Sequence, residues 1–164
     1  MRPLFLVTAV LLLGLGCSSQ AEGTSIGALA PEIAGKDLDG VAFQLSDYRG
    51  KVLLLDFWGD WSPACRAMYA HTRALVEQYD EAPFAVVGVN GDRDPRELAA
   101  QDIRWRSFWD GPEGRPGPIA EAWDVRSWPT LFLIDAKGVI RSKFMGVNEG
   151  ALDSAIEELL AELP

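Results

Sequence analysis

The chain has 164 residues, which is long enough for one domain with a hydrophobic core and too short for two ordinary domains. Hydrophobic residues make up 48% and charged residues 24%, close to average globular usage, which excludes a largely disordered chain. The formal net charge is −9 and Lys and Arg form no cluster, so the sequence lacks the basic footprint of a nucleic-acid-binding protein.

The first 16 residues have the pattern of a signal peptide, because Arg2 precedes an uncharged, largely apolar run over residues 4–15. This run is well short of the ~20 residues of a membrane-spanning helix. Residues 13–17 resemble a bacterial lipoprotein signal, although Gly14 stands where such signals usually have Leu. The resemblance implies that Cys17 becomes the lipidated first residue; a plain signal peptide that leaves Cys17 as a free thiol is the alternative. Both interpretations predict export to a compartment that permits disulfides.

Residues 20–27 are small and polar and predict a flexible tether. We therefore expect a signal peptide over residues 1–16, the anchor cysteine and tether over 17–27, and one domain over 28–164. Val41, Phe43 and Leu45 alternate with smaller or polar neighbours, which predicts a strand. Residues 52–58 are nearly continuous apolar sequence, typical of a strand buried on both faces, and are interrupted only by Asp56.

Helix and strand patterns alternate through the rest of the chain. We expect a helix from Pro63 to about Tyr79, a buried strand at 84–89, short helices at 94–101 and 119–123, strands at 131–134 and 139–144 joined by a Gly-containing turn, and a last helix from Asn148. This order predicts an α/β fold in which helices cover both faces of a mixed sheet.

Residues 56–65 (Asp-Phe-Trp-Gly-Asp-Trp-Ser-Pro-Ala-Cys) resemble the thioredoxin active-site segment, in which a buried Asp leads to Trp-Cys-x-x-Cys at a helix start. Residues 27–31, 45–51 and 128–130 are similar to the redoxin branch, which holds membrane-anchored thiol-disulfide oxidoreductases and borders the AhpC/TSA peroxiredoxin-like group. The resemblance covers the chain after the tether. It implies a thioredoxin-like fold, with a central mixed sheet, helices on both faces and an N-terminal β-hairpin extension.

The resemblance places Cys65, Ser62 and Asp56 in the catalytic centre, but Ser62 stands where the family has its attacking cysteine. Disulfide exchange needs one thiolate to attack and a second thiol to resolve the mixed disulfide, and a serine hydroxyl stays protonated without a base. His71 is nine residues further along the predicted helix, which places it about 180° around and roughly 13 Å along from Ser62. No serine triad is therefore possible, and we interpret His71 as an ordinary helix-face residue.

Cys65 is the remaining candidate for thiol chemistry. A helix start favours its thiolate, whereas the family's second cysteine is usually the more buried and less acidic one. The resemblance implies that Asp56 exchanges a proton with Cys65 through water; the alternative is an acid retained without a present role. Cys65 can form a mixed disulfide or oxidise to sulfenic acid, and only a free Cys17 could resolve either product.

The resemblance also implies a substrate groove, with Pro129 as the family's cis-proline. We assign to this groove Trp61, Pro63, Trp128, Pro129 and Thr130. Four further aromatic residues either line it or pack in the core: Trp105, Phe108, Trp109 and Trp123. Residues 111–118 form either a lid or a plain surface connection.

Three functions compete at this stage. We favour a thiol-disulfide oxidoreductase of the thioredoxin-like class that acts at most through the single thiol of Cys65. The alternatives are a non-catalytic binding module that uses the groove, and a peroxiredoxin-like peroxidase, whose motif is incomplete because Trp58 stands in place of its Pro.

The expected partners are protein thiols or disulfides, or a low-molecular-weight thiol, and the membrane through a lipid on Cys17. We expect a monomer without cofactor or nucleic acid, on the periplasmic side of a bacterial membrane. One His and two Cys cannot supply a closed zinc site, so no metal is expected either.

Overall fold

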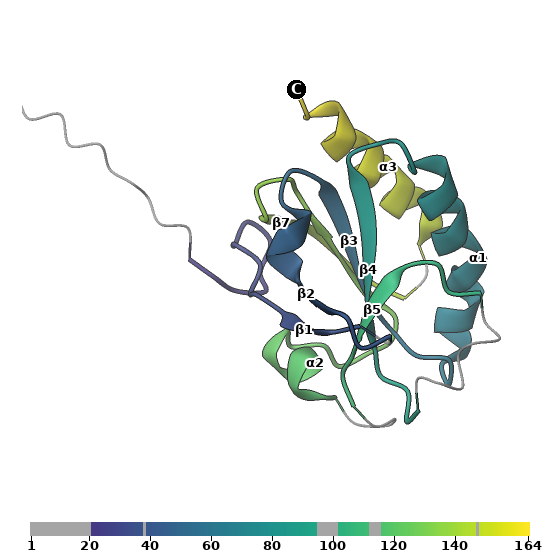
Figure 1. Cartoon of the computed structure of the whole chain (residues 1–164). Helices are drawn as coiled ribbons and strands as arrows, with labels where there is room; N and C mark the ends of the chain where they lie inside the picture. The colour runs from purple at the N-terminus through teal and green to yellow at the C-terminus, as the bar shows by residue number, and fades with distance from the viewer. Residues whose placement is uncertain (1–20, 38, 95–101, 112–115, 147) are drawn as a thin grey trace, which may run out of the picture.

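A five-stranded mixed sheet forms the centre of the molecule in this computed structural model, which describes residues 21–37, 39–94, 102–111, 116–146 and 148–164 (Figure 1). The strands, in spatial order, are β5 (Arg106–Trp109), β4 (Phe84–Asn90), β3 (Val52–Trp58), β6 (Thr130–Ile134) and β7 (Ile140–Met145). The first three are parallel to one another, while β6 runs antiparallel to β3 and β7 antiparallel to β6. The carboxyl ends of β3, β4 and β5 therefore lie side by side at one edge of the sheet.

Helices cover both faces of the sheet. Helices α1 (Pro63–Gln78) and α3 (Glu149–Ala161) lie on one face, and the short α2 (Pro118–Ala122) lies on the other (Figure 1). The same second face carries the antiparallel pair β1 (Ala34–Lys36) and β2 (Ala42–Gln44), followed by the 3-10 helix η1 (Leu45–Tyr48). This arrangement is the expected α/β fold with an N-terminal hairpin.

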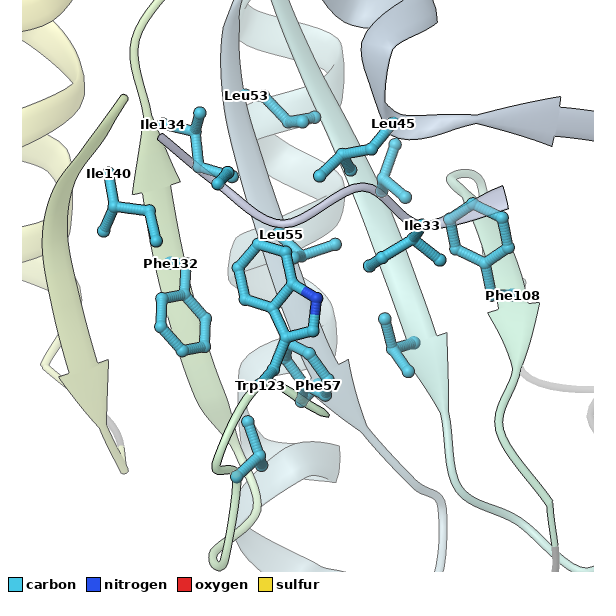
Figure 2. Close-up of a cluster of buried hydrophobic side chains, with 14 of the residues drawn as sticks. Ile33, Leu45, Leu53, Leu55, Phe57, Phe108, Trp123, Phe132, Ile134 and Ile140 are labelled. Carbon is cyan, nitrogen blue, oxygen red and sulfur yellow. The ribbon is translucent and has the colours of Figure 1, made fainter. Parts of the chain in front are cut away.

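The alternation of side chains along β3 divides the core into two clusters and fixes where Asp56 lies. Leu53, Leu55 and Phe57 pack with Trp123 on the face of the β1–β2 hairpin and α2 (Figure 2). Val52, Leu54 and Trp58 pack with residues of α1 and α3 on the opposite face. Since successive side chains point to opposite faces, Asp56 belongs to the second series and faces α1.

Most elements lie where the sequence predicts them, with three differences. Leu45 begins η1 instead of continuing the preceding strand, and Glu32 Oε1 accepts the N–H of Ser46 there at 3.2 Å. Strand β5 was not predicted, because Arg106 and Ser107 break its short apolar run. The helix expected at 94–101 lies almost wholly outside the described residues, as do residues 112–115 of the expected lid or connection.

The N-terminal segment joins the fold before residue 28. The N–H of Gly23 donates to the carbonyl of Leu29 at 3.0 Å, and the N–H of Gly27 donates to the carbonyl of Ile140 at 2.8 Å. Residues 21–27, expected as part of the tether, thus form backbone hydrogen bonds with Leu29 and with Ile140 at the start of β7. No helix within the described ranges is long and apolar enough to cross a membrane.

Candidate active site

The start of α1 places Ser62 and Cys65 together at the carboxyl edge of β3. Ser62 is the N-cap of α1, and its Oγ accepts the backbone N–H of Cys65 at 3.3 Å. Pro63 follows at the first helical position, where its missing N–H costs nothing. The helix then continues to Gln78. The residue that replaces the attacking cysteine therefore supports the helix that carries Cys65.

Cys65 is a buried thiol whose environment disfavours the thiolate. Its exposed fraction is only 1%. Burial raises the pKa of Cys65 to about 11, and the negative charges of Asp56 and Asp92 add to this effect. Hydrogen bonds from Ser62 and the Gly59 backbone lower the same pKa but do not offset the burial. At this cysteine, desolvation outweighs the hydrogen bonds that favour the thiolate.

Asp56 lies on the α1 side of the sheet with 3% of its surface exposed. Burial raises its pKa to about 7, so this carboxyl group changes its charge near neutral pH. Its Oδ1 has no hydrogen-bond partner among the described residues. Asp56 is therefore a buried proton donor and acceptor whose charge acts on Cys65.

The loop before β6 closes the site from the opposite side. The Trp128–Pro129 peptide bond is cis, and the Ser62 hydroxyl donates to the carbonyl of Trp128 at 3.4 Å. The rings of Trp61 and Trp128 lie 5.8 Å apart at 59°. Thr130, behind Pro129, donates to the carbonyl of Ser127 at 2.8 Å and is buried. Of the expected groove residues, the structure thus brings Trp61 and Trp128 together beside Ser62, while the hydroxyl of Thr130 turns inward to Ser127.

Asp92, which the sequence pattern did not single out, holds the loop between β3 and α1. Its two carboxylate oxygens accept the N–H of Asp60 at 2.9 and 3.0 Å, and Asn90 donates to one of them at 2.6 Å. Arg66 donates to the carbonyl of Asp60, and the Tyr69 hydroxyl donates to its carboxylate at 3.3 Å. The available signal was the polar Asn-Gly-Asp sequence directly after a buried strand, where parallel strands commonly carry site residues.

The aromatic residues with open assignments divide into two groups. Trp105, Phe108 and Trp123 are buried in the two core clusters, so they do not line a groove, whereas Trp109 is 48% exposed. His71 faces α3, where its Nε2 lies 2.9 Å from Asp153 Oδ1. Within the described ranges, His, Cys, Asp and Glu form no group that could hold a metal ion.

This fold and site define a thioredoxin-like protein. Residues 26–143 match the AhpC/TSA family, and the chain belongs to that family. It is 30% identical over 136 residues to the thioredoxin-like protein YneN of Bacillus subtilis, covering 79% of this chain and 76% of that protein. It is 28% identical over 137 residues to the thiol-disulfide oxidoreductase ResA of Bacillus cereus, with 80% and 76% covered.

A solved structure shows the same fold. The putative thiol:disulfide interchange protein DsbE of Chlorobium tepidum superposes with a TM-score of 0.74 at 30% identity, over 83% of this chain and 98% of that one. The thioredoxin-like fold expected from residues 56–65, and the relationship to thiol-disulfide oxidoreductases expected from residues 27–31, 45–51 and 128–130, are thereby confirmed.

Proposed function

We propose that this chain is an exported member of the thiol-disulfide oxidoreductase class that binds thiol- or disulfide-bearing polypeptides beside Pro129 and whose own redox chemistry is limited to Cys65. The observation that carries this proposal is the pair Ser62 and Cys65. A hydroxyl occupies the attacking position, and the only described cysteine lies buried behind it. Such a site can form one mixed disulfide but cannot resolve it.

The exposed aromatic surface at Trp61 and Trp128 supports the proposal of a polypeptide partner. Trp61 is 38% exposed and contacts the half-buried ring of Trp128, next to the cis-peptide of Pro129. Aromatic rings that combine a large apolar surface with a fixed position are favourable contacts for a partner chain. A peroxidase receives no support, because a peroxidatic cysteine needs a lowered pKa and access to peroxide, and Cys65 has neither.

The first test is the formation of a mixed disulfide on Cys65 in a Cys17→Ala background, so that only one thiol is present. Incubation with oxidised glutathione and intact-mass spectrometry should give one slow adduct. Because the pKa of Cys65 is about 11, the rate should rise roughly tenfold per pH unit between pH 7 and 10. Cys65→Ser is the control and should stay unmodified. A folded protein without any adduct at pH 10 would contradict single-thiol chemistry.

The burial of Cys65 supports a second candidate, a binding module without redox chemistry. A partner held only by the surface at Trp61 and Trp128 needs no thiol. Affinity capture from a native extract, compared between wild type and Cys65→Ala, separates the two candidates. The same partners at the same yield would favour the binding module, whereas loss of partners that reducing agent also releases would favour mixed disulfides.

We also propose that residues 1–16 are removed on export and that Cys17 carries the lipid that holds the protein on the periplasmic side of a bacterial membrane. The apolar run followed by small residues and Cys17 supports this proposal. Cys17→Ala should release the protein into the soluble fraction, as measured by fractionation and immunoblotting. A variant that stays with the membrane would show that the anchor is not a lipid on Cys17.

A further inference from the structure

Trp109 is an exposed aromatic residue that the fold holds in place. It is the last residue of β5, and 48% of its surface is exposed. Its indole Nε1–H nevertheless donates to the backbone carbonyl of Asp92 at 2.8 Å. A ring fixed in this way loses little freedom when a partner covers it, which is the property of a binding anchor.

Asp92 connects this ring with the active-site loop. While its carbonyl accepts from Trp109, its carboxylate accepts the N–H of Asp60, the residue before Trp61. Asn90 fixes Asp92 from both sides, since its amide donates to the carboxylate and its Oδ1 accepts the N–H of Asp92 at 3.1 Å. One residue thus positions the loop of Trp61 and the ring of Trp109 relative to each other.

The strand order sets the distance between Trp109 and the loop that carries Trp61. Trp109 ends β5, and Trp61 follows the end of β3, two positions away in the order β5-β4-β3 (Figure 1). Neighbouring strands lie about 4.8 Å apart, so the two positions are separated by roughly 10 Å, which about three residues of an extended chain can span. Trp128 is in contact with the Trp61 ring, and its indole Nε1 lies 3.6 Å from the position that a Cβ at Gly91 would take, so it adjoins the segment that precedes Asp92.

We propose that Trp109 extends the binding surface of Trp61 and Trp128, and that this surface takes an extended polypeptide segment with apolar side chains flanked by basic residues. The inference rests on the proposed function, because it assumes that the partner lies beside Pro129. The three rings supply contacts for apolar side chains along the partner. The formal net charge of −9 attracts basic residues over a distance that salt limits.

The probe is a fluorescein-labelled peptide, Gly-Lys-Phe-Ser-Phe-Lys-Gly, whose binding is measured by fluorescence polarisation at low salt. It contains no cysteine, so the chemistry of Cys65 plays no part. Trp109→Ala should weaken binding about tenfold, as should Trp61→Ala. Trp109→Phe keeps an aromatic ring but loses the N–H that Asp92 accepts, so it should weaken binding measurably but less than Trp109→Ala does. Val41→Ala is the control, because Val41 is an apolar residue of similar exposure, 55% against 48% for Trp109, that lies in the turn between β1 and β2. A peptide with Glu in place of Lys should bind more weakly.

The outcomes separate this inference from the proposed function. Binding that Trp61→Ala abolishes and Trp109→Ala leaves unchanged would overturn the role of Trp109 while preserving the surface beside Pro129. Equal binding of the Lys and Glu peptides would overturn the preference for basic partners. No binding by the wild type would overturn the inference entirely, whereas the glutathione adduct on Cys65 tests the redox proposal separately.

Discussion

Ser62→Cys should convert the protein from a nearly inactive form into a dithiol reductase, raising insulin reduction with a dithiol donor by at least about 100-fold. The Oγ of Ser62 accepts the N–H of Cys65 at the start of α1 and donates to the carbonyl of Trp128. A thiolate at the same position would accept the N–H of Cys65 and be stabilised by the positive end of the α1 dipole. It would attack the substrate disulfide, and Cys65 would then resolve the mixed disulfide from one turn along the helix.

Two comparisons make this experiment decisive. Ser62→Cys/Cys65→Ala should open substrate disulfides but stop at the mixed disulfide, so it should show no turnover. Wild-type activity equal to that of Ser62→Cys would mean that the absence of the first cysteine does not limit the reaction. A folded but inactive Ser62→Cys variant would instead show that the site no longer supports dithiol exchange, and the binding module would become the better proposal.

The parts of the site that follow from local pattern could be predicted from the sequence. The apolar run with Asp56 gave β3 with the bounds that the structure has, because a strand buried on both faces needs such a run. Pro63 after a polar residue marked the start of α1. Together they placed Ser62 and Cys65 at one edge of the sheet, which is the essential geometry of the site.

The parts that depend on packing between distant segments could not be predicted. The helix start favoured a thiolate at Cys65, whereas the resemblance implied a more buried and less acidic cysteine, and the sequence could not decide between them. The burial in the structure raises the pKa of Cys65 and so agrees with the second expectation. The hydrogen bonds from the Asp60 N–H to the Asp92 carboxylate need the end of β4 to lie beside Asp60, which is 32 residues from Asp92 in sequence. Trp105 and Trp109 lie four residues apart and therefore belong to the same face of the β5 segment. Trp105 nevertheless packs against Trp58 and Tyr69 in the core, while Trp109 stays exposed, and this difference depends on distant segments that the local sequence does not show.

Asp56→Asn should remove a large pH dependence of stability. The unfolded chain ionises Asp56 near its ordinary pKa of 3.8, whereas the folded chain keeps it protonated until about pH 7. Between these values the folded state binds the extra proton, so the free energy of unfolding falls as the pH rises. The whole contribution is present below about pH 4 and lost above about pH 7, and it amounts to roughly 4 kcal/mol at most.

Urea unfolding at half-unit intervals from pH 4 to 8 measures this effect as the difference in the free energy of unfolding between wild type and Asp56→Asn. As the pH rises from 4 to about 7, the free energy of unfolding of the wild type should fall relative to that of Asp56→Asn. Every other titrating group is common to both proteins, so its contribution cancels in the difference. Asp80→Asn is the matched control: Asp80 is exposed, follows the other end of α1, and should give a nearly constant difference. A constant difference for Asp56→Asn as well would show that Asp56 is ionised in the folded protein throughout the range, and that it cannot hold a proton for Cys65 near neutral pH.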